Sequence, residues 1–116
     1  EEGARVVAAV HALAGTEDGI SIAVTGGMNR PPFPETEATL GLYARARVLA
    51  EGHGYRLPKQ HRGGGSDGNF TAVMGIPTLD GLGCTGGGAH APDEHIRWPD
   101  LAPRCATLCA LLETLE

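Results

Sequence analysis

A histidine behind a glycine-rich loop is the first candidate for chemistry in this sequence. His90 follows three glycines and stands close to Asp93 and Glu94. A neutral imidazole is the commonest metal ligand in proteins, and glycine neighbours leave such a side chain free to reach into a cleft. Spacing alone nevertheless favours an inert histidine on a surface loop, with Asp93 and Glu94 as solvated loop charges.

A second glycine-rich loop, Gly63–Ser66, could bind an anion. Glycines let a backbone approach a ligand closely, and the N–H groups at the start of a helix attract carboxylate or phosphate. A plain hinge between a strand and a helix explains the loop equally well. The loop is not an ATP-binding P-loop, because no Gly-Lys-Ser/Thr follows it.

Arg30 is a candidate of a different kind. It precedes Pro31 and Pro32, so its backbone is biased toward an extended geometry. A guanidinium on such a stem suits a bidentate grip on a carboxylate. An ordinary exposed arginine gives the same pattern, and without further information that interpretation is favoured.

Alternating helices and short strands must position these residues. We expect helices over residues 2–14, 35–51 and 69–74 and a last helix that includes residues 101–115, with strands over 19–25, 55–61 and 77–82. Such alternation predicts an α/β layer arrangement. The prolines within residues 29–34 predict an extended connector and a boundary between two structural units.

The last helix carries the clearest apolar stripe. Helical spacing places on one face Leu101, Cys105, Leu108, Leu112 and Leu115. We expect this face to pack in the core together with Cys105 and Cys109. Two thiols four residues apart on a helix could also bind one metal ion, but core packing is the favoured interpretation.

Composition limits the class of protein. The 116 residues make about one small domain, and 14 acidic against 9 basic side chains leave a net charge of −5, which excludes a basic nucleic-acid footprint. The sequence contains no run of about 18 apolar residues, so it predicts no transmembrane helix. Three cysteines are too few for a disulfide scaffold, so we expect a reducing, cytoplasmic compartment. The sequence starts without Met inside a predicted helix, and we expect a piece of a longer protein.

Four motifs together resemble one group of enzymes. They span residues 29–33, 63–70, 75–83 and 86–94 and read NRPPF, GGGSDGNF, GIPTLDGLG and GGGAHAPDE. In order and spacing they resemble the zinc-dependent aminoacylase and glutamate carboxypeptidase-type metallopeptidases. Acetylornithine deacetylase and succinyl-diaminopimelate desuccinylase belong to the same group. The resemblance covers nearly all of residues 19–116.

The resemblance implies a two-lobed α/β enzyme of which this chain is the C-terminal segment. Residues 1–30 resemble the end of a lid or dimerisation domain, with its last helix and strand. Residues 31–116 resemble the C-terminal part of a three-layer α/β/α catalytic domain. On the same basis we expect a homodimer of the full-length protein.

The resemblance also implies roles for the candidate residues. In such enzymes two zinc ions share a bridging carboxylate and activate the water that cleaves a peptide bond or an N-acyl amino acid amide. His90 corresponds to the last metal ligand. Arg30 corresponds to the arginine that binds the free carboxylate of a small-molecule substrate. The loop that lines this carboxylate corresponds to Gly64, Gly65 and Ser66.

The other functional residues of this group have no counterpart in the sequence. These are a His-x-Asp ligand pair and an adjacent Glu-Glu pair, and we expect them, with the general base, to lie upstream. Because a catalytic zinc site needs about three protein ligands, we expect the 116 residues alone to be inactive. Two alternatives stay open: a non-catalytic carboxylate-binding module derived from this family, and a structural zinc site made by Cys105, Cys109 and a histidine.

Overall fold

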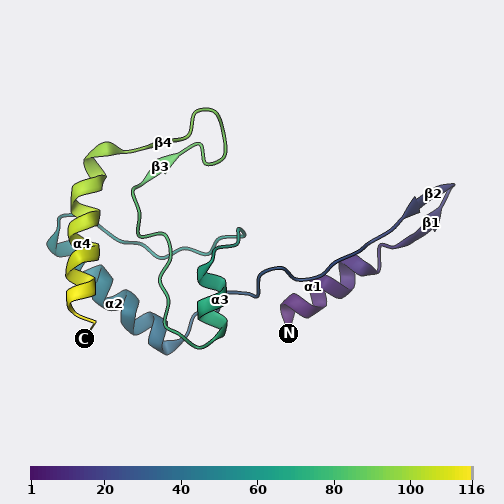
Figure 1. Ribbon diagram of the computed structural model, residues 1–116, viewed down its shortest axis with the longest axis horizontal. Helices are drawn as coiled ribbons and strands as arrows, with labels where there is room; N and C mark the ends of the chain where they lie inside the picture. Colours follow the sequence, from purple (N-terminus) through teal and green to yellow (C-terminus); the bar gives the residue numbers. More distant parts are fainter. Residues whose placement is uncertain (116) are drawn as a thin grey trace.

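Helices and two small hairpins make up the computed structural model, which describes residues 1–115 (Figure 1). In chain order the elements are α1 (Glu2–His11), β1 (Gly15–Glu17), β2 (Ile20–Ile22), α2 (Glu37–Gly52), α3 (Gly68–Val73), β3 (Gly86–Gly87), β4 (His95–Ile96), a 3₁₀ turn (Trp98–Asp100) and α4 (Leu101–Glu113). This mixture agrees with the predicted α/β class. The predicted second domain ends at residue 116, which lies outside the described residues. Within those residues, none of the helices is both long and apolar enough to cross a bilayer.

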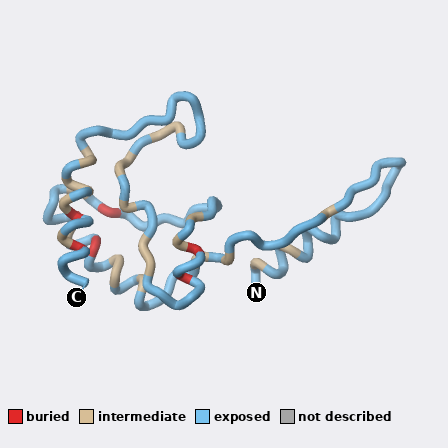
Figure 2. The backbone as a smooth tube through the Cα atoms, viewed as in Figure 1, coloured by how far each residue is buried: buried red, intermediate tan, exposed pale blue. Residues whose placement is uncertain are grey.

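The chain is extended and has two separate parts. Helix α1 and the β1–β2 hairpin project to one side, while α2, α3 and α4 gather on the other (Figure 1). The radius of gyration is 19.2 Å and the longest dimension is 61 Å. A compact domain of this size has a radius of gyration of about 13 Å. The few buried residues lie among the α2–α4 part (Figure 2).

The N-terminal part differs from its prediction in detail. Helix α1 ends at His11, earlier than expected, and a hairpin follows whose turn is Asp18-Gly19. Both turn residues have positive φ, 50° and 78°, a geometry that an Asp-Gly pair favours in two-residue hairpins. A strand forms within the predicted range 19–25, but it covers only Ile20–Ile22, and because all residues of β1 and β2 are exposed, the predicted half-burial is wrong. The His11 ring lies 2.8 Å from the Gly26 carbonyl oxygen and holds the end of the hairpin beside α1.

Helices α2 and α4 pack against each other around a small core. Thr36 caps α2, because its side chain accepts a hydrogen bond of 3.1 Å from the Thr39 N–H. The core consists of Ala46, Ala50, Leu57 and Leu111. The Tyr43 hydroxyl donates a hydrogen bond of 2.9 Å to the Leu57 carbonyl and so ties the segment after α2 back to the helix.

Helix α4 buries a different face from the predicted one. The predicted stripe is exposed at Cys105, Leu108, Leu112 and Leu115. The buried face instead carries Thr107 and Leu111, and Leu111 packs in the core with Ala46 and Ala50 of α2. Thr107 is accommodated there because its hydroxyl donates a hydrogen bond of 2.9 Å to the Pro103 carbonyl. Cys109 is exposed as well, so the prediction that the two cysteines pack in the core is wrong.

The two strands predicted over 55–61 and 77–82 do not form. Residues 55–61 and 77–82 pair with no strand in the described part of the chain. Alternating or apolar residues favour an extended backbone, but a strand forms only where a neighbour satisfies its N–H and C=O groups. The short helix predicted over 69–74 is confirmed as α3.

Candidate carboxylate-binding site

Short polar side chains build the turn that starts α3. The Ser66 Oγ accepts a hydrogen bond of 2.9 Å from the Gly68 N–H, and the Ser66 carbonyl accepts one of 3.2 Å from the Asn69 N–H. Serine and aspartate favour such turns because their side chains bond to nearby main-chain groups. The turn leaves Asp67 at the N-terminal end of α3 with its carboxylate exposed.

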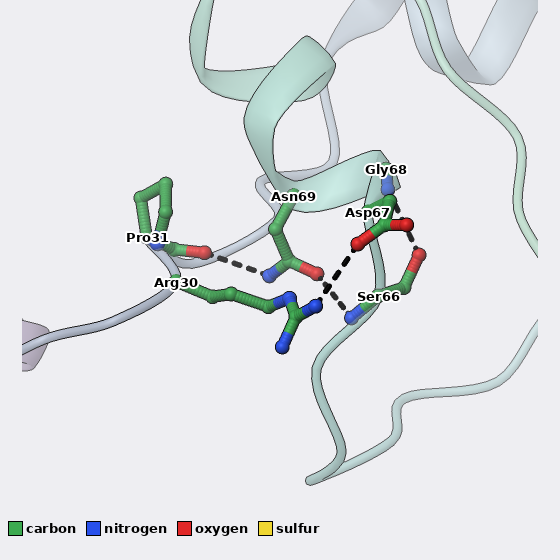
Figure 3. A network of polar contacts seen from close by, with 6 residues as sticks. All are labelled: Arg30, Pro31, Ser66, Asp67, Gly68 and Asn69. Carbon is green, nitrogen blue, oxygen red and sulfur yellow. Dashed lines mark hydrogen bonds and ion pairs between the residues drawn. The ribbon is translucent and has the colours of Figure 1, made fainter.

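Asn69 connects this turn to a distant part of the chain. The residue is buried, at 9% exposure. Its Oδ1 accepts a hydrogen bond of 2.8 Å from the Ser66 N–H, and its Nδ2 donates one of 2.7 Å to the Pro31 carbonyl (Figure 3). Both ends of the amide are therefore paired, which is what burial of a polar side chain requires.

The Arg30 guanidinium lies beside the same turn. Its Nη2 donates a hydrogen bond of 2.9 Å to the Asp67 Oδ1 (Figure 3). Its Cζ lies 5.7 Å from the centre of the Phe70 ring. The side chains of Arg30 and Asp67 are 43% and 92% exposed. An ion pair so open to solvent contributes at most about 1 kcal/mol. Another carboxylate can therefore take the place of Asp67 at little cost.

Arg30, Gly65 and Ser66 lie close together at this place. A Cβ built on Gly65 would lie 2.8 Å from the Arg30 Cδ, so the arginine stem passes directly over the Gly65 main chain. Gly64 adjoins this contact but has open space around it, since a Cβ there would meet nothing within 4 Å. Three of the predicted residues thus lie together, with Gly64 next to them in the loop.

Sequence reasoning missed the two residues that hold this arrangement, Asp67 and Asn69. Both lie within the GGGSDGNF motif, whose residue types alone predict no role for them. The run of turn-forming types from Ser66 to Asn69 could have predicted a polar turn before α3. It carries no signal for the contacts with Arg30 and Pro31, which are more than 30 positions away in the chain.

Gly65→Ala is expected to disturb the Arg30 side chain without unfolding the protein. The new Cβ forces the Arg30 Cδ to move, and the flexible stem can do so by changing rotamer. We expect the contact with Asp67 to be lost and KM for a carboxylate-bearing substrate to rise about tenfold. The free energy of unfolding should change by less than about 1 kcal/mol, as a thermal melt of the intact protein will measure.

Gly63→Ala is the matched control, because a Cβ at Gly63 would meet no atom within 4 Å. Its KM should stay at the wild-type value. An equal rise in KM for both variants would mean that the flexibility of the loop, rather than the Gly65–Arg30 contact, governs binding.

The β3–β4 hairpin presents the loop that contains His90. Gly86 pairs with Ile96, and a Cβ on Gly86 would overlap the His95 carbonyl oxygen, so only glycine fits at this register position. Between the two strands, Gly88 takes a positive φ of 66°. The glycines before His90 therefore shape the hairpin that carries it.

His90 itself is exposed and stands apart from Arg30. Its φ is +65°, an uncommon left-handed conformation for a residue with a side chain. Its N–H donates a hydrogen bond of 3.3 Å to the Glu94 Oε2. The loop extends away from α3 (Figure 1). The structure thus brings the predicted carboxylate-binding residues together but does not bring His90 to them.

The described residues do not form a metal site on their own. Within residues 1–115, no group of three or more His, Cys, Asp or Glu side chains is arranged to hold a metal ion. A zinc site needs about three protein ligands, and His90 offers one. Cys105 and Cys109 are free, exposed thiols. The residues present therefore do not fit a catalytic zinc centre or a structural one without further ligands.

Comparison with known protein families decides the class of the protein. A family model described as Peptidase family M20/M25/M40 matches residues 2–114. The chain belongs to this family. No curated protein and no solved structure gives a significant match.

Membership of peptidase family M20/M25/M40 supports a peptidase-type hydrolase as the full-length protein. It agrees with the resemblance to metallopeptidases read from the four motifs. The family is generally metal-dependent, which agrees with the expected use of a metal by the full-length protein.

Proposed function

We propose that this chain is the C-terminal segment of a zinc-dependent exopeptidase or amidohydrolase that cleaves a peptide or an N-acyl amino acid. Family membership over residues 2–114 supports the hydrolase class. The order of the four motifs favours the aminoacylase and glutamate carboxypeptidase group within it. The observation that carries the choice of substrate is the Arg30 guanidinium, which already binds a carboxylate, that of Asp67, at 2.9 Å.

Arg30 has donors to spare for a substrate. A guanidinium presents five N–H donors in a planar fork, and among the described residues the Arg30 side chain donates only to Asp67. A substrate carboxylate can bind the remaining N–H groups or displace the exposed Asp67. Arg30 is therefore our candidate for the residue that selects substrates with a free carboxylate.

The Ser66 hydroxyl is the second donor to this carboxylate in our proposal. The Ser66 N–H is already bonded to Asn69, so it is not free for a ligand. The Oγ accepts a hydrogen bond from Gly68, which leaves the hydroxyl proton available. Gly64 and Gly65 then serve by letting the loop approach the ligand without side chains in the way.

A division into domains is part of the same proposal. We assign residues 1–30 to a lid or dimerisation domain and residues 31–116 to a three-layer catalytic domain. The separation of α1 and the β1–β2 hairpin from the α2–α4 part supports a boundary near Pro31 (Figure 1). The segments 55–61 and 77–82, which pair with no strand in the described part of the chain, leave room for partners from elsewhere in the protein.

The polypeptide of residues 1–116, expressed by itself, is expected neither to bind zinc tightly nor to hydrolyse a substrate. The reason is that a catalytic zinc site needs about three protein ligands, and His90 supplies only one of them. Isothermal titration with zinc and assays with hippuryl and N-acyl amino acid substrates measure both properties. Metal-dependent turnover by the purified polypeptide would contradict the proposal.

A non-catalytic carboxylate-binding module is the alternative, favoured by one observation: the Arg30 site is assembled here, whereas His90 stands apart from it. The two functions differ in the intact protein. The hydrolase loses turnover when a chelator removes its metal and regains it when zinc is restored. The binding module binds an N-acyl amino acid equally well with and without metal and releases no product.

A further inference from the structure

Asn69 holds together the two segments that form the candidate site. We propose that Asn69 is a positioning residue, whose buried amide sets the spacing between the Arg30–Pro31 backbone and the Gly63–Ser66 loop so that both address one substrate carboxylate. This inference rests on the proposed function, since it assigns Asn69 a role in the same carboxylate recognition. It adds a residue that touches neither the substrate nor a metal.

The chemistry of the amide explains why asparagine stands here. The group to be bonded on one side is a carbonyl, that of Pro31, and on the other side an N–H, that of Ser66. Only a side chain with both a donor and an acceptor can bridge them. An ionised aspartate has no donor, and alanine has neither group. With the residue only 9% exposed, water cannot readily replace the lost contact.

The two bonds act close to the atoms that bind the ligand. Pro31 directly follows Arg30 and has a fixed φ, so holding its carbonyl restricts where the arginine stem starts. On the other side, Ser66 directly follows Gly65, whose main chain lies against the Arg30 Cδ. The Asn69 amide thus holds the neighbours of both Gly65 and Arg30, the two residues whose contact sets the position of the guanidinium. Figure 3 shows its bonds to Ser66 and Pro31.

The test uses the intact protein and a pair of substrates, an N-acyl amino acid and the same compound with its carboxylate converted to an amide. The ratio of kcat/KM for the two is the carboxylate preference. Asn69→Ala and Asn69→Asp are expected to lower this preference at least about tenfold, mainly through a higher KM for the acid. The rate for the amide substrate should change little, because it does not use Arg30.

Two comparisons separate positioning from a general loss of structure. Ala72→Gly weakens α3 at a buried position without touching the bridge, and it should leave the preference unchanged. In an Arg30→Ala background, Asn69→Ala should cause no further loss of preference, since the two residues act on one contact. An additive loss would overturn the positioning role.

Amide hydrogen exchange gives a readout that does not depend on activity. Asn69→Ala should speed the exchange of the Ser66 N–H, whereas Ala72→Gly should not do so selectively. A wild-type protein that shows no preference for the acid overturns the proposed function, and the positioning role with it. A wild-type protein that prefers the acid, together with an Asn69→Ala variant that keeps the preference, overturns the positioning role alone.

Discussion

Replacement of Arg30 by alanine is expected to lower kcat/KM for an N-acyl amino acid about a hundredfold in the intact protein. A hydrogen bond to a charged group contributes about 1.5–3 kcal/mol, and the loss of a bidentate pair reaches the upper part of this range. The effect should fall on KM, because the guanidinium binds a part of the substrate that does not react. Steady-state kinetics with the acid and its amide measure the change.

The matched control is Arg47→Ala, which removes another exposed arginine that faces a carboxylate, Glu51, at 4.0 Å. This variant should keep wild-type kinetics. Arg30→Lys should recover only part of the loss, because an ammonium lacks the planar fork of donors. If Arg30→Ala lowers kcat/KM equally for the acid and the amide, Arg30 does not recognise the carboxylate.

Replacement of His90 by alanine is expected to abolish metal-dependent turnover of the intact protein. Mutation of a residue that only hydrogen-bonds to a metal ligand already lowers metal affinity or activity by about 10–100-fold. Loss of a ligand itself should therefore exceed about a hundredfold. Metal content after dialysis, measured by elemental analysis, and the kcat of the zinc-loaded protein test the two parts of the expectation.

His95→Ala provides the control in the same loop region. The His95 Nδ1 lies 2.9 Å from the Asp93 carbonyl oxygen, so this ring is engaged locally. The variant should retain its metal and at least most of its turnover. A protein that keeps full metal content without His90, or loses metal without His95, would contradict the assignment of His90 as a ligand.

Helices were predictable from local chemistry. The expected helix over 35–51 nearly coincides with α2, because Thr36 supplies a cap and Gly52 and Gly54 stand at its C-terminal end. The buried face of α4 was not predictable in the same way. This helix has apolar residues on more than one side, and the contact of Leu111 with Ala46 and Ala50 of α2 is tertiary, so the sequence of the helix alone does not show which side turns inward.

Strands were harder to predict, because a strand is defined by its partner. Residues 55–61 and 77–82 each contain a proline and have few β-branched residues, and no strand in the described part of the chain pairs with them. The hairpin strands that do form are two or three residues long, too short to carry an alternating pattern. Asp18-Gly19 was the one local signal that could have revealed the first hairpin.

The candidate site was predictable in its residue types and not in its connections. The chemistry of Arg30 and of the Gly63–Ser66 loop made them candidates, but only the resemblance of the four motifs assigned Arg30 and Ser66 to a carboxylate. The bridge through Asn69 could not be predicted, because the hydrogen bonds of a buried amide are tertiary contacts, which produce no periodic pattern in the sequence. The separation of His90 from Arg30 likewise follows from the path of the β3–β4 hairpin.

The exposed thiols of α4 can be labelled to test whether other parts of the protein or a partner cover this helix. A maleimide modifies Cys105 and Cys109 freely while the outer side of this helix is open to solvent. Any polypeptide that covers the helix slows both reactions together, and the partly buried Cys84 serves as an internal reference. Counting modified thiols by mass spectrometry in the intact protein therefore shows whether the outer side of α4 is covered, with no substitution needed.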